Sequence, residues 1–200
     1  MFTLARYERP RRRSRLKYAP AMAIVPDDKD WTWVLDRRCP ECGFVSSELA
    51  REQITPATLH NARQWAGILT ADPERLRHRP RPDRWSVLEY SCHVRDVFRV
   101  MDERLNLMLA LDNPSFQNWD QDRTALEDHY EAQDPKQVAA ELTAAADALA
   151  GGFAGVEGPA WQRPGIRSNG ARFTVETLGR YMIHDVVHHL HDVAGDDVAR

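Results

Sequence analysis

The sequence lacks any apolar run that approaches the roughly 18 residues of a membrane-spanning helix. No apolar segment follows its basic N-terminus, so no secretory signal peptide is recognisable. Cysteine is scarce, with three residues in 200, and an odd count without a secretion signal argues against a disulfide framework. These absences favour a cytoplasmic protein. A hydrophobic content of 42% and a charged content of 28% are ordinary for a globular domain with a real core.

Charge is distributed unevenly along the chain. Residues 1–21 hold seven basic residues and one acidic residue, a net charge of +6, whereas the rest holds 20 basic and 29 acidic residues, a net charge of −9. We expect residues 1–21 to form a disordered basic leader, unless translation starts at Met22. A basic segment can contact nucleic acid or anionic lipid, but the acidic body argues against nucleic acid as the main partner.

Four segments after residue 50 have apolar side chains at helical spacing. Each is preceded by a residue that can cap the first turn, namely Thr55, Ser86, Asp134 and Thr174. Gly151 and Gly152 are expected to end the third helix. No segment has a convincing strand pattern, and "DNPSFQNWDQD" reads as a long loop. The sequence therefore predicts an all-α, four-helix bundle over residues 53–195, preceded by an irregular segment, residues 22–52.

The fourth predicted helix contains "RYMIHDVVHHLHDV", which holds four histidines. His184 and His188 are four residues apart, so they share one helix face, with Cβ atoms about 5–6 Å apart. Two imidazoles in this arrangement can bind one divalent metal. His191 could extend the same face. His189 is rotated by about 100°, and we expect it to face solvent or to pack elsewhere.

A third ligand is expected from the second predicted helix. His93 lies in line with Val97 and Val100, on the side of that helix expected to be buried. A lone histidine there could equally be a satisfied core residue, but a shared metal explains both inward-facing histidine sites. Three histidines with open positions for water are typical of catalytic zinc sites, whereas structural sites usually close all four positions with protein ligands.

The string "HDVVH" invites comparison with the HExxH motif of metalloproteases, in which the glutamate is the general base. Here Asp185 is one methylene shorter, and the third ligand would come from upstream, so a protease is not favoured. We expect Asp185 to lie at the surface or, like Asp96 on the second helix, to orient a metal-bound histidine.

The "CPECG" motif places Cys39 and Cys42 three residues apart, which is half of a zinc-ribbon site. The second half is missing, because Cys92 is alone. Three interpretations remain open: a reduced pair in a tight turn, a redox-active pair, or metal ligands acting with a histidine or at the bundle metal itself. In the last case the N-terminal segment would fold over the bundle mouth and cap the site. Cys92 is expected to pack as a small apolar residue.

The stretches "RWSVLEYSCHVRDVFRVMDERL" and "RFTVETLGRYMIHDVVHHLHDV" resemble the DinB-like superfamily of four-helix bundles, over roughly residues 53–195. The pattern is similar to the thiol-dependent branch, which includes mycothiol-dependent maleylpyruvate isomerases and bacillithiol transferases. The resemblance implies a divalent metal, zinc or nickel, held by His93, His184 and His188, and commonly a homodimer. "DDKDWTWVLDRRCPECGF" and "NWDQD" further resemble an uncharacterised actinobacterial subgroup.

The function that this resemblance implies is the activation of a low-molecular-weight thiol such as mycothiol, which would attack a small electrophilic substrate. Arg167 and Arg172 could hold a carboxylate or a sugar hydroxyl of the bound molecules, or they could be solvated loop charges. Trp119 could form a wall of the pocket, or it could simply fill a packing loop. The alternative function is a non-enzymatic metal-binding or stress protein whose site is capped by the cysteine segment.

Overall fold

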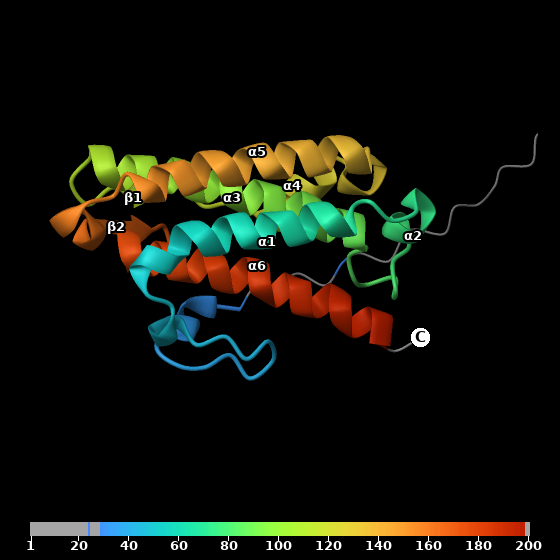
Figure 1. Ribbon diagram of the computed structural model, residues 1–200, viewed down its shortest axis with the longest axis horizontal. Helices are drawn as coiled ribbons and strands as arrows, with labels where there is room; N and C mark the ends of the chain where they lie inside the picture. The colour runs from blue at the N-terminus through green and yellow to red at the C-terminus, as the bar shows by residue number, and fades with distance from the viewer. Residues whose placement is uncertain (1–23, 25–28, 199–200) are drawn as a thin grey trace, which may run out of the picture.

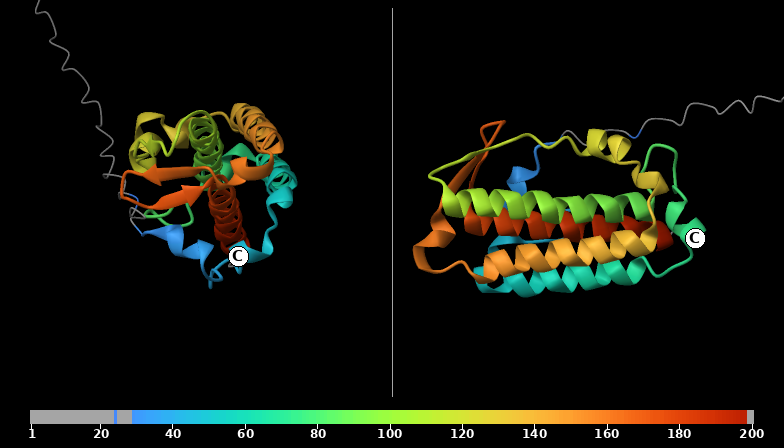
Figure 2. Two further views of the ribbon diagram at one scale, coloured as in Figure 1. Left: turned by 90° about the vertical axis from the view of Figure 1, so that its left-hand side faces the viewer. Right: turned by 90° about the horizontal axis from the view of Figure 1, so that it is seen from above.

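The structure is a computed structural model that describes residue 24 and residues 29–198, so the predicted basic leader lies outside the described residues. Four long helices form the bundle (Figure 1): α1 Ile54–Ile68, α3 Val87–Ala110, α5 Pro135–Ala154 and α6 Val175–Val198. Helices α1 and α3 each pack against both α5 and α6, and the end-on view in Figure 2 shows the four helices surrounding one core. The predicted all-α, four-helix fold is confirmed.

Most of the predicted helix caps form. Ser86 and Glu89 make the capping box of α3, and the Asp134 carboxylate accepts hydrogen bonds from the first turn of α5. The Thr174 hydroxyl accepts a 3.1 Å hydrogen bond from the backbone N–H of Thr177 at the start of α6. The prediction for Thr55 is wrong: the 3-10 turn Arg51–Gln53 leads directly into α1, which begins one residue before Thr55.

The predicted end of the third helix is also wrong. Helix α5 continues through Gly151 and Gly152 to Ala154. A Cβ on Gly152 would lie 2.9 Å from the Leu105 side chain of α3. Glycine at this position therefore allows α5 to approach α3 closely, and it does not terminate the helix.

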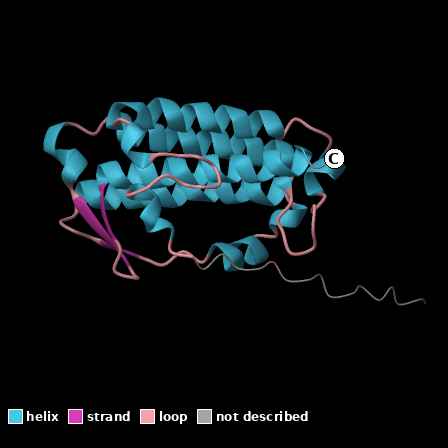
Figure 3. Cartoon of the chain, turned by 90° about the horizontal axis from the view of Figure 1, so that it is seen from below, coloured by secondary structure: helices cyan, strands magenta, loops and turns pink. Residues whose placement is uncertain are grey.

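A small sheet, which the sequence did not reveal, lies at one end of the bundle (Figure 3). Strand β1 Ser115–Phe116 pairs in parallel with β2 Pro164–Arg167, and β2 pairs antiparallel with β3 Arg172–Thr174. Two short helices complete the fold, α2 Pro73–Arg77 and α4 Gln121–Glu127. The long loop predicted at residues 112–122 therefore contains β1 and the start of α4.

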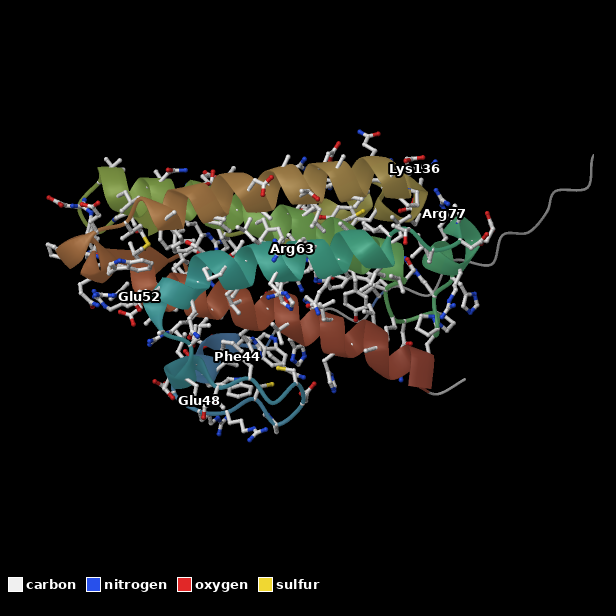
Figure 4. The ribbon with its side chains drawn as sticks, viewed as in Figure 1. Phe44, Glu48, Glu52, Arg63, Arg77 and Lys136 are labelled. Atoms are coloured by element: carbon white, nitrogen blue, oxygen red, sulfur yellow. The ribbon has the colours of Figure 1, made fainter. Side chains whose placement is uncertain are left out.

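The N-terminal segment is irregular, as predicted, and contains the 3-10 turns η1 Trp31–Leu35, η2 Ser46–Glu48 and η3 Arg51–Gln53. Turns η1 and η2 contact α6. Figure 1 shows this segment (blue) along the outer side of α6 (red), and Figure 4 labels Phe44 on the part of the segment next to that helix.

The core between the long helices contains large buried side chains, among them Trp65, Phe98, Leu142 and Phe153. Cys92 is fully buried in a second apolar cluster beside Tyr130, so its predicted packing is confirmed. Within the described residues, none of the helices combines the length and the apolarity that crossing a bilayer requires.

Candidate metal centres

Helix α6 presents two adjacent sets of potential metal ligands. Residues four apart share a face of a helix, so His184 pairs with His188, and Asp185 pairs with His189 on a face rotated by about 100°. The first pair lies with Cys39 and Cys42, and the second pair lies with His93 of α3; within each set the potential ligand atoms are all within 4.8 Å of one another. We call these the cysteine group and the bundle group.

The bundle group has the geometry of a three-ligand site. Asp185 Oδ1 lies 3.4 Å from His93 Nε2 and 3.6 Å from His189 Nε2. Ligand atoms around a tetrahedral zinc with bonds of about 2.0–2.1 Å are roughly 3.3–3.4 Å apart. The two imidazoles are nearly perpendicular, with an 85° angle between the rings and centroids 4.8 Å apart. These three atoms therefore need only small shifts to hold one cation.

Unsatisfied polar atoms support a metal in the bundle group. His93 is fully buried, yet neither of its ring nitrogens has a hydrogen-bond partner among the described residues, and the same is true of Asp185 Oδ1. A buried polar atom without a partner costs about 1–3 kcal/mol. A cation bound between them would satisfy His93 Nε2 and the carboxylate oxygen together.

A second carboxylate orients His189. The Nδ1 of His189 lies 3.0 Å from Asp192 Oδ2, and Asp192 in turn accepts hydrogen bonds from the Arg84 guanidinium. If Nδ1–H donates to this carboxylate, the Nε2 lone pair points at the bundle group. Such carboxylate–histidine pairs are common around bound metals.

The charge states of the bundle group also suit a cation. Burial lowers the pKa of His93, so the imidazole is neutral near pH 7. Burial by itself would raise the pKa of Asp185, but the adjacent His93 imidazole and the neighbouring histidines outweigh it and lower the pKa to about 2. His93 therefore offers a neutral nitrogen and Asp185 an anionic oxygen, the forms that bind metals.

A polar cavity of about 800 Å³ opens beside the bundle group and is bordered by Asp185 and His189. Trp119 lines it and stacks on His93, with ring centroids 5.3 Å apart and an interplanar angle of 8°. Its indole N–H donates a 3.0 Å hydrogen bond to Thr124. Trp119 thus forms part of the cavity wall, and its predicted role in binding stays a prediction. The bundle group faces a space large enough for a small molecule.

The two arginines proposed to bind ligands lie in different places. Arg167 on β2 lines the cavity and donates a 3.4 Å hydrogen bond to the Tyr181 hydroxyl. Arg172 on β3 is exposed and is not among the described residues that line this cavity. Its proposed role in binding stays a prediction, whereas the position of Arg167 fits such a role.

The cysteine group has four protein ligands. Cys39 Sγ lies 3.7 Å from His188 Nδ1, and Cys39, His184 and His188 are buried, with Cys42 half-buried. Burial lowers the pKa of His184 to about 4, so this imidazole is neutral. Burial also raises the pKa of the Cys42 thiol to about 11, which disfavours a free reactive thiolate. The cysteines are free thiols.

The ligands predicted from the sequence therefore fall into different groups. His93, His184 and His188 do not form one of the sets of potential ligand atoms among the described residues, because α3 meets the Asp185–His189 face of α6. His189, expected to lie away from the metal, contacts His93. The spacing of Asp185 and His189 matches that of His184 and His188, and this was the signal in the sequence for the second pair.

Asp96, also expected to orient a metal ligand, has other partners. It forms ion pairs with Arg95 and Arg99 and accepts a hydrogen bond from the Tyr130 hydroxyl. Asp192, which was not singled out from the sequence, contacts His189. Exposed His191 lies beside His188, with ring centroids 6.3 Å apart, and belongs to neither group.

Comparisons with known proteins agree with this fold. The sequence model of the DinB superfamily matches residues 55–193. A search of curated proteins found no match. Among solved structures, the chain is similar to YfiT from Bacillus subtilis, described as a probable metal-dependent hydrolase with an unusual four-helix bundle topology. The TM-score is 0.64 at 16% sequence identity, and the alignment covers 88% of this chain and 93% of that one.

Proposed function

The chain belongs to the DinB superfamily, and from this premise we propose that it is a metal-dependent enzyme that transfers a low-molecular-weight thiol, of the mycothiol type, to a small electrophile. The observation that carries the proposal is the bundle group, in which His93, Asp185 and His189 converge beside a polar cavity. Three protein ligands leave a coordination position for an exogenous molecule, as catalytic metal sites require.

A divalent cation held by the bundle group would lower the pKa of a thiol that contacts it, and so supply a thiolate near neutral pH. The protein's own residues prepare this chemistry. Asp192 fixes the orientation of His189, and the indole of Trp119 covers one face of the His93 ring and excludes water from it. The ligands are therefore positioned before substrate enters.

Other residues of the cavity suit an anionic or hydroxyl-rich ligand. The Arg167 guanidinium lines the cavity beside the Tyr181 hydroxyl, and Arg84 and Lys29 also border it. A guanidinium binds a carboxylate through paired hydrogen bonds. We infer that Arg167 holds a carboxylate of the thiol or of the electrophile while the thiolate, its proton lost to solvent, forms a bond to the electrophilic carbon and the leaving group departs from that carbon with its electron pair.

Cobalt-substituted protein tests the proposal. Addition of mycothiol, or of cysteine as a simpler probe, should produce sulfur-to-cobalt charge-transfer absorption as the thiol binds. The double variant Cys39→Ser/Cys42→Ser should show the same increase in absorption when thiol is added, which would assign the increase to the added thiol and not to the protein's own cysteines. His93→Ala should show no increase. Consumption of thiol by a chlorodinitrobenzene probe then measures transfer. Absence of any spectral response to thiols in metal-loaded protein would overturn thiol transfer.

Hydrolysis is the second candidate function, favoured by the fold shared with YfiT and the description of that protein. The same open position would then activate water in place of a thiol. Hydrolysis of a nitrophenyl ester without added thiol, lost in His93→Ala, would support it. A purely metal-binding protein would show neither reaction. Zinc or nickel as the metal, a homodimer and a cytoplasmic location stay predictions.

A further inference from the structure

The cysteine group lies on the outer face of α6, where the "CPECG" turn meets the helix. We propose that Cys39, Cys42, His184 and His188 hold one Zn²⁺ in a closed structural site that fixes the N-terminal segment, residues 29–53, to the bundle. The proposal does not depend on the proposed function, because none of these four residues belongs to the bundle group.

The distances fit a tetrahedral Cys₂His₂ site. With zinc–sulfur bonds of about 2.3 Å and zinc–nitrogen bonds of about 2.0–2.1 Å, a sulfur and a nitrogen ligand are roughly 3.6 Å apart. Cys39 Sγ and His188 Nδ1 are 3.7 Å apart. The four potential ligand atoms are all within 4.8 Å of one another, so a single ion can reach them after small side-chain shifts.

The backbone around the cysteines forms a tight knuckle. The N–H of Gly43 donates a 3.0 Å hydrogen bond to the Cys39 carbonyl, and the Cys39 N–H donates a 2.9 Å hydrogen bond to the Phe44 carbonyl. Gly43 has a φ of +78°, and a Cβ there would lie 3.2 Å from the Arg38 guanidinium. Glycine is thus required for the turn that brings both sulfurs to α6.

The two imidazoles are oriented as ligands. His188 Nε2 lies 3.5 Å from the Glu41 carboxylate, which belongs to the "CPECG" turn itself, and its other nitrogen faces Cys39. His184 is 3% exposed, and its Nε2 has no hydrogen-bond partner among the described residues. A metal would satisfy this buried nitrogen, and Glu41 would fix the tautomer of His188.

Aromatic rings enclose the group. Trp31 packs against both imidazoles, with ring centroids 5.6 Å from His184 and 4.8 Å from His188. Phe44 packs against His184, with ring centroids 5.6 Å apart, and Figure 4 labels it on the part of the segment next to α6. Two thiolates and two imidazoles favour zinc over magnesium or calcium, which prefer oxygen ligands.

The site would also shape the cavity. Trp31 and Glu41 from the N-terminal segment line the cavity together with His184 and His188. A zinc ion that joins the segment to α6 would therefore hold one wall of the cavity next to the bundle group. The zinc of the cysteine group would have four protein ligands, so it would hold this wall in place without binding the substrate itself.

Zinc-loaded His93→Ala protein provides the test, because it lacks the complete bundle group. We expect one zinc per chain in this variant, and X-ray absorption should report two sulfur and two nitrogen neighbours. Cys39→Ser and Cys42→Ser in the same background should abolish zinc retention. Cys92→Ser is the matched control, because this buried thiol lies outside both groups, and it should leave the zinc in place.

Wild-type protein gives an independent measurement should a variant fail to fold. An organomercurial should release zinc as it titrates Cys39 and Cys42, and cobalt-loaded protein should show thiolate absorption before any thiol is added. A Cys39–Cys42 disulfide in freshly purified protein, or a zinc with no sulfur neighbours, overturns the proposal. If the bundle group binds no metal, wild-type protein would still hold one sulfur-ligated zinc, so the two proposals can fail separately.

Discussion

The two groups of potential metal ligands on α6 are displaced by one residue, and they differ in the number and the chemical type of their ligand atoms. The cysteine group has four protein ligands, two of them sulfur, under the ring of Trp31. The bundle group has three protein ligands and opens on a cavity of about 800 Å³. Four protein ligands suit a structural metal ion, whereas three protein ligands with an open coordination position suit catalysis. One helix can therefore carry both, because a step of one residue rotates the ligands by about 100°.

The sharpest test of this difference removes one ligand of the bundle group. His93→Ala should abolish turnover and strip the metal from the bundle group, while the cysteine group keeps its zinc. The loss should exceed the roughly 10–100-fold typical of substituting an outer-shell partner. Turnover together with metal content per chain measures both effects.

The control for this test is His191→Ala, an exposed histidine on the same helix that belongs to neither group. It should retain both metals and full turnover. His189→Ala should behave like His93→Ala, whereas the ligand set predicted from the sequence requires His189→Ala to keep its metal. Loss of turnover and bundle metal in His184→Ala, with both retained in His189→Ala, would reverse our assignment of the two faces.

The four long helices were predictable because their caps and apolar spacings are local. Ser86 with Glu89 and Asp134 with Pro135 identify the helix starts without any tertiary information. The sheet was not predictable, because its strands are two to four residues long and show no alternation. Their pairing depends on close packing between strands, as at Gly165, where a Cβ would clash with the Phe116 ring.

The sequence indicated a metal-binding helix but not which of its faces meets α3. The sequence revealed His93 and a metal-binding pattern on the last helix, but two pairs there have the same four-residue spacing. Which pair meets α3 depends on the rotation of α6 about its axis, and packing against the N-terminal segment and α3 sets that rotation. The cysteines raised the possibility of a metal, but their partners His184 and His188 are about 150 residues away, beyond the reach of local patterns.

Loss of zinc from the cysteine group should destabilise the protein. Cys39→Ser in zinc-loaded protein should lower the free energy of unfolding by roughly 3–5 kcal/mol and the Tm by roughly 6–20 °C. The N-terminal segment, residues 29–53, should become sensitive to protease while the helix content measured by circular dichroism is retained. Cys92→Ser is the matched control, because it makes the same substitution at a buried thiol outside both groups, and it should leave the protease resistance of residues 29–53 unchanged. Equal protease resistance of wild-type and Cys39→Ser protein would contradict the proposal that zinc fixes residues 29–53 to the bundle.

Without metal, the two groups should make the protein sensitive to acid. Burial lowers the folded-state pKa of His93, His184 and His188, and for His184 the value is about 4. The unfolded imidazoles, with pKa values of about 6.5, therefore bind protons first. The free energy of unfolding should fall as the pH drops below about 6.5 and continue to fall until about pH 4, with His184 contributing about 2–3 kcal/mol.

Denaturant titrations of chelator-treated protein at several pH values measure this dependence. His184→Gln should reduce the loss of stability between about pH 6.5 and pH 4. His60→Gln is the matched control, because His60 is an exposed histidine on α1, and it should leave the dependence unchanged. If the free energy of unfolding changes with pH equally in wild-type and His184→Gln protein, burial of this imidazole does not control stability in acid.

The smallest expected effects come from substituting the carboxylate that contacts a histidine in each group. Asp192 contacts Nδ1 of His189, and Glu41 contacts Nε2 of His188. Asp192→Asn should weaken metal binding at the bundle group by roughly tenfold, about 1.4 kcal/mol, and leave the cysteine group unchanged. Glu41→Gln should do the reverse, and by less, because Glu41 is exposed and its contact is longer. Competition titrations with a chromogenic chelator resolve both affinities. If either variant weakens both sites equally, the two groups share their ligands, and the division of α6 into a closed face and an open face does not hold.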